Sequence, residues 1–323
     1  MGTEMNNILV IGSTGQIGSE LTPALRENYG ADSVVGTYWS TEPTGDLTDG
    51  PMEKLDVTDR ESVAETIEKY DIDSVFNLAA ILSAKGEENP QMAFRINVVG
   101  FFHLLQLGLE YKLNRIINPS SIGVFGPEVP SQQAPNETVL RPTSMYGVTK
   151  VTDELLGNYY YQRFGLDVRG LRLPGIVSSK TLPGGGTTDY AVEVFYEAIR
   201  EGHYTFFVRK DTTLPLMYMP DCVKALIDLA EADLDNLKHH CDFNVSSMSF
   251  SAGELAHKIE EHIPEFTYDF EPDERQKIAD SWPDSMDDTP AREEWGWEPD
   301  YGLDAMVEDM IEKLKVKLQQ DAT

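Results

Sequence analysis

Tyr146 and Lys150 form a Tyr-x-x-x-Lys pair that could carry out acid–base chemistry. On a helix, residues four positions apart share one face, so the lysine ammonium can lie close to the phenol. A nearby cation lowers the pKa of a phenol toward working pH, and the phenolate can then accept a proton from a substrate alcohol. The alternative is a tyrosine and a lysine on one solvated helix face, because this spacing is common.

Two further polar positions could serve the same reaction. Ser120 and Ser121 follow an apolar segment that predicts a strand, and a hydroxyl there could reach the same substrate oxygen. Asn97 precedes a long apolar stretch that predicts a buried helix over 98–111. The alternative interpretation of Asn97 is a helix cap.

Three glycines, Gly12, Gly15 and Gly18, are spaced G-x-x-G-x-x-G. They lie between a buried strand predicted over 8–11 and an amphipathic stretch over 17–29. Glycines permit a tight turn and a close backbone approach to a pyrophosphate, and the helix N-terminus supplies aligned N–H groups. This context predicts a dinucleotide site, whereas the alternative is a structural turn.

Cofactor preference is normally set at the end of the second strand. A carboxylate there binds the ribose hydroxyls of NAD and repels the 2′-phosphate of NADP. This chain has Thr37, Tyr38, Trp39 and Ser40 in that region, with no carboxylate. Positions 31–53 also hold no lysine or arginine, which favours NAD.

The elements that must position these residues alternate between strands and helices. Strands are predicted over 8–11, 34–37, 55–57, 75–80, 115–119 and 168–173, and helices over 17–29, 59–69 and 98–111. This alternation predicts an α/β fold with a Rossmann-type, doubly wound parallel sheet. Ligands of such sheets bind at the carboxyl ends of the strands.

The pattern becomes less regular after Pro174. We predict a dinucleotide-binding domain over 1–174, to which 215–244 returns, and a smaller C-terminal substrate lobe over 175–214 and 245–323. Residues 183–186 predict a mobile loop, 189–201 a helix and 216–219 a strand. Asp221 is the predicted N-cap of the helix that follows.

Composition excludes several classes of partner. The 323 residues include 26 basic and 55 acidic ones, a net charge of −29, which argues against nucleic acid and is compatible with a halophilic surface. No apolar run approaches the ~18 residues of a membrane helix, and no leader opens the chain, so we expect no membrane partner and a cytoplasmic protein. We expect no metal site, because His239, His240 and Cys241 are adjacent rather than spaced as ligands.

The motifs in their order resemble the extended short-chain dehydrogenases/reductases. They are the glycine triplet, Asp56-Val57, Asn77-Leu78-Ala79-Ala80, Asn97, Ser120-Ser121-x-x-Val-Phe-Gly and Tyr-x-x-x-Lys, and the resemblance covers about residues 7–316. Within that superfamily, segments 80–87, 173–176, 183–192, 216–221 and 277–285 resemble the short-chain type of L-threonine 3-dehydrogenase.

The resemblance implies oxidation of the L-threonine β-hydroxyl to 2-amino-3-ketobutyrate, with hydride transfer to NAD. Tyr146 would be the general base, Lys150 would bind the nicotinamide ribose, Ser121 would bond the reacting oxygen and Asn97 would hold a relay water. The implied cofactor residues are Gly12, Gly15, Gln16, Ile17, Gly18, Thr37, Asp56, Val57, Leu78, Ala79, Ala80, Asn97, Tyr146, Lys150, Leu173, Gly175 and Ile176. Relatives pair through two helices, which implies a homodimer.

An amino-acid substrate needs donors for its carboxylate and an acceptor for its ammonium. The candidate substrate residues are Ser83, Ser120, Tyr146, Gly184, Thr187, Thr188, Asp189 and Trp282. The candidate donors are neutral, so neutral side chains and the backbone of the glycine loop would hold the carboxylate. Asp189 could bind the ammonium or cap a helix. The alternative functions are a sugar-nucleotide epimerase or dehydratase, and a non-catalytic NAD(P)-sensing protein.

Overall fold

A six-stranded parallel sheet forms the centre of the N-terminal half in the computed structural model, which describes residues 4–182 and 184–321. Its order is β3-β2-β1-β4-β5-β7. The strands are β1 (Ile8–Ile11), β2 (Val34–Tyr38), β3 (Met52–Lys54), β4 (Ser74–Asn77), β5 (Arg115–Ile117) and β7 (Val168–Arg169). The predicted α/β fold with a doubly wound parallel sheet is confirmed.

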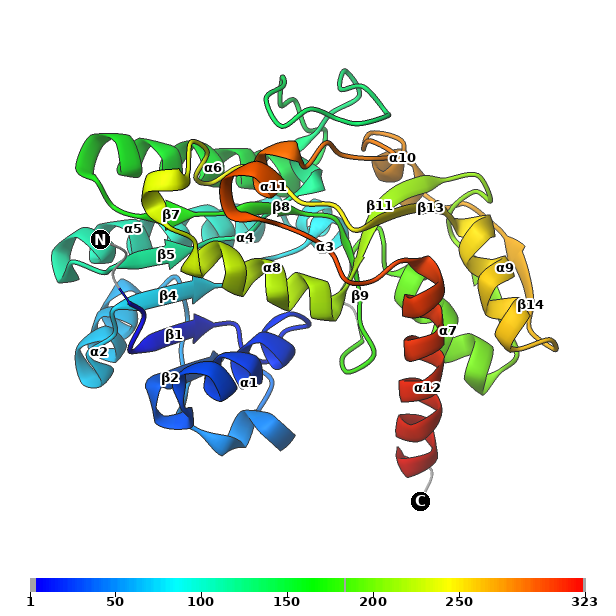
Figure 1. Cartoon of the computed structure of the whole chain (residues 1–323), viewed down its shortest axis with the longest axis horizontal. Helices are drawn as coiled ribbons and strands as arrows, with labels where there is room; N and C mark the ends of the chain where they lie inside the picture. The colour runs from blue at the N-terminus through cyan, green and yellow to red at the C-terminus, as the bar shows by residue number, and fades with distance from the viewer. Residues whose placement is uncertain (1–3, 183, 322–323) are drawn as a thin grey trace.

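Helices cover both faces of this sheet (Figure 1). One face carries α1 (Gly18–Tyr29) and α8 (Met219–Glu231), and the other carries α2 (Arg60–Tyr70), α5 (Gly100–Tyr111) and α6 (Met145–Phe164). Alternate residues of β1 serve the two faces: Ile8 and Val10 pack in the first core, Leu9 and Ile11 in the second. Because both faces are buried, the strand is an unbroken apolar run.

Two predicted strands are wrong in position. The third strand is Met52–Lys54 rather than 55–57, because Asp56 accepts hydrogen bonds from the N–H and hydroxyl of Thr58 and forms the turn before α2. The strand predicted over 168–173 is divided at Gly170, where a Cβ atom would lie 2.6 Å from the Asn118 carbonyl oxygen. Beyond it, β8 (Leu171–Leu173) pairs with β6 (Ser120–Ser121) and β12 (Phe243–Asn244).

The helix predicted over 98–111 begins earlier, at Pro90. It runs through α4 (Pro90–Ala93), a π-helical turn η3 (Phe94–Val99) and α5. Asn89 caps its start by accepting a hydrogen bond from the Met92 N–H, so Asn97 is not a cap. By length and composition alone this continuous helix could span a membrane, which the sequence prediction of no such run missed. Half of its most apolar window is buried inside the fold, as in a core helix.

The C-terminal half has small sheets and its own core (Figure 1). One sheet joins β9 (Gly175–Val177), β11 (Thr213–Tyr218) and β13 (Met248–Ser251), and another joins β10 (His203–Phe206) and β14 (Thr267–Phe270). The helices of this half are α7 (Tyr190–Arg200), α9 (Ala252–His262), α10 (Arg275–Ala279), α11 (Thr289–Trp295) and α12 (Leu303–Asp321). Helix α3 (Ser83–Glu88) belongs to the N-terminal half, where it follows β4. Short 3₁₀ turns are η1 (Ala31–Ser33), η2 (Gly45–Asp49), η4 (Ile122–Val124) and η5 (Leu234–Asn236).

The division of the chain into two lobes stays a prediction. Of the stretches assigned to them, residues 1–3, Pro183 and residues 322–323 lie outside the described residues. The predicted N-cap Asp221 is wrong, because α8 already begins at Met219. Asp221 is instead fully buried and accepts hydrogen bonds from the Ser247 hydroxyl and from the N–H groups of Asp300 and Tyr301.

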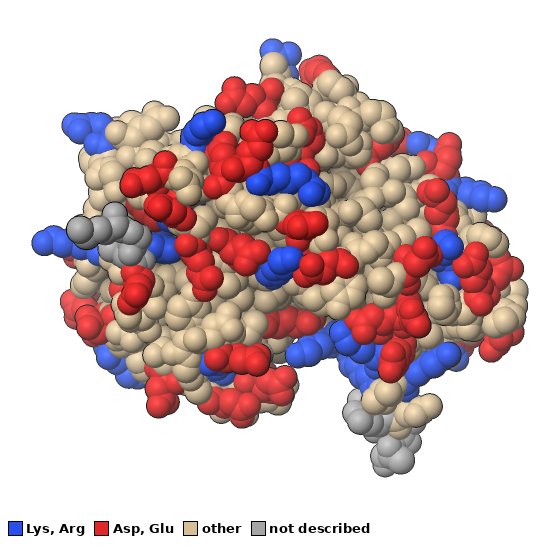
Figure 2. Space-filling model, viewed as in Figure 1, with Lys and Arg blue, Asp and Glu red and all other residues tan. Residues whose placement is uncertain are grey.

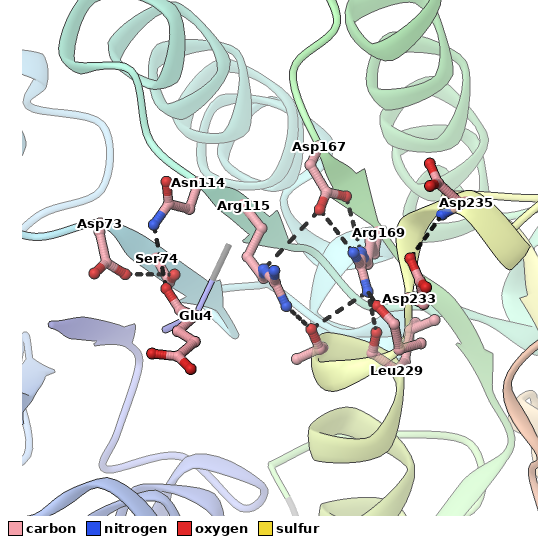
Figure 3. A network of polar contacts seen from close by, with 12 residues as sticks. Glu4, Asp73, Ser74, Asn114, Arg115, Asp167, Arg169, Leu229, Asp233 and Asp235 are labelled. Carbon is pink, nitrogen blue, oxygen red and sulfur yellow. Dashed lines mark hydrogen bonds and ion pairs between the residues drawn. The ribbon is translucent and has the colours of Figure 1, made fainter. Parts of the chain in front are cut away.

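Two buried arginines tie the sheet to the end of α8 (Figure 3). Arg169 donates to both carboxylate oxygens of Asp167 at 2.8 Å, and to the carbonyls of Leu229 and Ala232 at 2.7 Å. The Arg115 Nε lies 4.0 Å from the Asp167 Oδ2, and the Arg115 guanidinium donates to the carbonyl of Ala230 at the same end of α8. We call Arg115, Asp167 and Arg169 the arginine cluster. It places cations at a helix C-terminus, where they offset the partial negative charge of the carbonyls.

On the face shown in Figure 2, acidic side chains are spread widely rather than gathered at one place. Basic side chains are interspersed among them on the face shown. On the face shown, the distribution is that of a solvated, mainly acidic surface.

Candidate active site

A cavity of about 440 Å³ opens where the glycine turn, the ends of β4, β6 and β8, and the loop before α7 meet. Most predicted site residues line it. They are Gly12, Gly15, Gln16, Ile17, Gly18, Leu78, Ala80, Ser83, Ser120, Ser121, Tyr146, Lys150, Leu173, Gly175, Ile176, Gly184, Thr187, Thr188, Asp189 and Trp282. Five others lie outside the lining, namely Thr37, Asp56, Val57, Ala79 and Asn97.

The glycine turn has the geometry of a phosphate cradle. Gly12 has φ +85°, a conformation that side chains disfavour. A Cβ at Gly18 would lie 2.2 Å from the Gly12 carbonyl oxygen, so only glycine lets α1 start so close to β1. The Gln16 side chain donates to the Ile176 carbonyl at 3.3 Å and joins the turn to β9. These residues fit the pyrophosphate of a dinucleotide at a helix N-terminus.

Thr37 supports this turn from behind instead of facing the cavity. Its hydroxyl accepts a hydrogen bond from the Gly12 N–H at 3.2 Å, and its own N–H donates to the Ser13 hydroxyl at 3.1 Å. The side chain is buried. Thr37 therefore supports the backbone at Gly12, a contact that the sequence does not reveal.

Tyr146, Lys150 and Ser121 converge on one wall of the cavity. The Lys150 Nζ lies 5.9 Å from the centre of the Tyr146 ring and donates to the Pro119 carbonyl at 2.7 Å. The Ser121 hydroxyl accepts from the Gly123 N–H at 3.1 Å. A Cβ at Gly123 would lie 3.1 Å from the Tyr146 ring, so this glycine lets the ring pack against the turn. The arrangement places a phenol, a cation and a hydroxyl together, as acid–base catalysis requires.

Asn97 and Ser120 make contacts that their expected roles do not include. Asn97 accepts from the Ile81 N–H at 2.8 Å and donates to the Thr149 hydroxyl at 3.0 Å, so it fastens the loop after β4 to α6. It lies in the π-helical turn, a feature that often occurs at functional sites. The Ser120 hydroxyl donates to Glu154 at 2.5 Å. A substrate would therefore compete with a buried carboxylate for this hydroxyl.

Several candidate substrate residues come from α3 and from the loop before α7. The Ser83 and Thr187 hydroxyls lie 3.2 Å apart. Asp189 precedes α7 but makes no cap bond to it; its carboxylate accepts from the N–H groups of Gly185 and Gly186 at 2.9 and 2.7 Å. Burial raises the pKa of Asp189 to about 6, because desolvation outweighs these two backbone hydrogen bonds. Asp189 thus shapes the glycine loop.

Sequence reasoning missed one charged residue of the lining, Lys85. Its aliphatic stem lies against the loop, with Cγ 3.2 Å from where a Cβ of Gly185 would be. The expectation that neutral donors hold the substrate carboxylate stays a prediction, and Lys85 adds one cation to the lining residues around them. The only signal for Lys85 was its place within segment 80–87, which also contains the lining residue Ser83.

Known proteins share this fold along nearly the whole chain. The model of the NAD dependent epimerase/dehydratase family matches residues 8–246. An uncharacterized epimerase/dehydratase of Staphylococcus haemolyticus is 44% identical, over 98% of this chain and 99% of the relative. An L-threonine dehydrogenase from Clostridium difficile has 43% identity and TM-score 0.95, covering 98% and 99% of the two chains.

A second solved structure carries information on assembly. It is described as a monomeric L-threonine 3-dehydrogenase from a metagenome and has 43% identity and TM-score 0.93, covering 96% of this chain and 99% of that one. With a family model that matches most of its length and relatives above 40% identity, this chain belongs to the NAD dependent epimerase/dehydratase family.

Proposed function

We propose that this chain oxidises the β-hydroxyl of L-threonine to 2-amino-3-ketobutyrate with NAD. The observation that carries this proposal is the convergence of Tyr146, Lys150 and Ser121 on a cavity that starts at the glycine turn. The 43% identity to the Clostridium difficile and metagenomic threonine dehydrogenases, along nearly the whole chain, supports the choice of substrate.

Each group of the cavity has a part in the proposed reaction. Ser121 donates a hydrogen bond to the substrate oxygen, and Tyr146 takes the hydroxyl proton. Lys150, which the Pro119 carbonyl holds at 2.7 Å, stabilises the phenolate by its charge. The glycine turn, together with Leu173, Gly175 and Ile176, would hold a dinucleotide, whose nicotinamide would supply the hydride acceptor for the β-carbon. The hydroxyls of Ser83, Thr187 and Thr188 and the ring N–H of Trp282 orient the amino acid.

The experiment measures the absorbance of reduced nicotinamide with purified protein. NAD or NADP is offered with L-threonine, allo-threonine, serine or 3-hydroxybutyrate, each at low and at molar salt. We expect reduction of NAD by L-threonine and at least tenfold less with each other substrate. Silence on every amino acid, together with copurification of a sugar nucleotide, would replace the proposal by the epimerase or dehydratase function. Cofactor binding without any turnover would favour a sensor.

The preference for NAD is part of the proposal. No lysine or arginine occupies 31–53, although Lys54 follows directly and its Cα pairs with that of Tyr38. A 2′-phosphate at the end of β2 would therefore meet one cation and the nearby carboxylate of Glu42, which interacts with Tyr38. Equal or faster turnover with NADP would contradict the preference.

The same proposal includes a homodimer built on α5 and α6. Large apolar side chains are exposed there: Phe102 at 38%, Leu155 at 66% and Tyr159 at 52%. Such a group of exposed side chains is typical of an association surface. Light scattering should give twice the mass of one chain, and Leu155→Glu should reduce it to a single chain. A monomeric wild type, as described for the metagenomic relative, would contradict this part.

A further inference from the structure

Asp153 is a buried carboxylate that the proposed reaction does not use. It lies one helical turn after Lys150 on α6, and its Oδ2 is 3.9 Å from the Lys150 Nζ. Both side chains are shielded from solvent, at 3% exposed for Asp153 and 7% for Lys150. A charge placed there acts on Lys150 with little screening by water.

The carboxylate is only partly satisfied by hydrogen bonds. Its Oδ1 is buried and has no hydrogen-bond partner among the described residues. Asn118 bonds the carboxylate and in turn accepts from the Asn77 side chain at 2.7 Å. Asn77 lines the cavity, so a line of polar groups joins Asp153 to the site. A buried oxygen without a donor disfavours the ionised form.

The other titratable groups around Asp153 contribute little net charge. Glu154, its neighbour on α6, forms two 2.8 Å bonds with Arg172 of β8, and the two charges cancel. Cys241, which precedes β12, is a buried thiol whose pKa burial raises, so it stays neutral. Lys150 is thus the close charged group in contact with Asp153. Burial raises the pKa of Asp153 to about 7, because desolvation outweighs the attraction of Lys150.

We propose that Asp153 is a positioning residue that acts through Lys150 and sets the pH at which Tyr146 loses its proton. This inference rests on the proposed roles of Tyr146 and Lys150. An ionised Asp153 offsets part of the ammonium charge and so opposes formation of the phenolate. A protonated Asp153 leaves the whole ammonium charge to act on Tyr146. The titrations of Asp153 and Tyr146 are therefore coupled. The acid limb, in which activity rises with pH, then reports apparent pKa values of the two groups together.

The test compares Asp153→Asn, which removes the charge at constant size, with wild type. The readout is kcat/KM for threonine oxidation as a function of pH. Because Asn cannot oppose the phenolate, we expect the acid limb to move about one pH unit lower and to become steeper. Asp153→Glu keeps the charge and should keep the wild-type limb. Asp167→Asn, in the arginine cluster, should lower the melting temperature and leave the limb in place.

A second readout makes the inference independent of turnover. Tyrosinate absorbance of wild type and Asp153→Asn is titrated, each against the same protein with Tyr146→Phe, so that the difference reports the Tyr146 phenol alone. We expect the same downward shift there. If wild type oxidises no threonine, the proposed function fails, and the absorbance titration still decides on Asp153. The inference would be overturned if, in Asp153→Asn, neither the acid limb of the pH–activity profile nor the titration of the Tyr146 phenol shifted. Should that variant not fold, Asp153→Ser takes its place.

Discussion

Two buried charge groups on either side of the sheet edge are built in opposite ways. In the arginine cluster, Arg169 donates to both oxygens of Asp167 at 2.8 Å and fills its remaining positions with carbonyls of α8 (Figure 3). In the Lys150–Asp153 pair, the charged atoms stand 3.9 Å apart and one carboxylate oxygen has no partner among the described residues.

The difference separates a structural group from a reactive one. A saturated ion pair is costly to break, because either partner alone would be a buried charge. It therefore holds one protonation state and one geometry. An unsaturated pair changes protonation at a lower cost, since its hydrogen bonds do not all favour the ionised form. The first kind fastens α8 to β5 and β7, and the second contains the candidate catalytic lysine.

The largest expected effect is on catalysis, at the residue next to the Lys150–Asp153 pair. Tyr146→Phe removes the proposed general base and should lower kcat/KM for threonine about 10³-fold. The melting temperature should stay close to that of wild type, and NAD should still bind, as measured by fluorescence titration. Retained activity in this variant would refute the proposed mechanism.

Substitutions in the arginine cluster should instead lower the free energy of unfolding. Arg169→Met leaves Asp167 buried without its main partner and should cost about 3–5 kcal/mol of unfolding free energy, measured by chemical denaturation. The kcat of the folded fraction should not change. Arg60→Met is the control: it breaks an exposed pair with Glu110, which should cost at most about 1 kcal/mol. Equal losses in the two variants would contradict the comparison.

An intermediate effect on cofactor binding is expected at Thr37, which supports the glycine turn. Thr37→Val removes the acceptor of the Gly12 N–H, at a cost of about 1–2 kcal/mol to the geometry of the turn. That corresponds to a rise of about 5- to 30-fold in the KM for NAD, with a smaller change in the KM for threonine. Thr48→Val, at an exposed position, should change neither constant. An unchanged KM for NAD in Thr37→Val would show that Gly12 needs no support.

At Asp189, one substitution can test both a structural role and a role in substrate binding. Its folded-state pKa, about 6, lies above the usual value, so ionisation opposes folding and stability falls as pH rises through the range from about 4 to 6. Asp189→Asn retains an acceptor for Gly185 and Gly186 without the buried charge. We expect it to be about 3 kcal/mol more stable at pH 8, because the pKa is raised by about two units at about 1.4 kcal/mol per unit, and nearly equal in stability at pH 4. A threonine KM raised about tenfold would assign the substrate ammonium to Asp189; an unchanged KM would leave it a loop residue.

The smallest effect is expected at the rim of the cavity. Lys85 is exposed, so its attraction for a carboxylate is screened by water and salt. Lys85→Gln should raise the KM for threonine about two- to threefold at low salt, and the difference should vanish at molar salt. A larger effect that persists in salt would mean that Lys85 contacts the substrate directly.

The sequence by itself determined the alternation of strands and helices along the chain and the residue types of the cavity. The apolar run 8–11, the glycine spacing and the Tyr-x-x-x-Lys pair each follow from local rules, namely burial on both faces, backbone freedom and helical periodicity. For this reason the fold class was predicted correctly, and most of the candidate residues lie together in one cavity.

Tertiary structure alone decided the partners of each side chain. Thr37 faces Gly12, Ser120 faces Glu154 and Asp221 faces the segment before α12, because these contacts join residues that are far apart in the sequence. The same holds for the charge state of Asp153. Periodicity places it near Lys150, but its burial and its unsatisfied oxygen depend on the surrounding fold, including the hydrogen bond with Asn118. Local patterns select residue types, whereas desolvation and hydrogen-bond saturation are properties of the packed molecule.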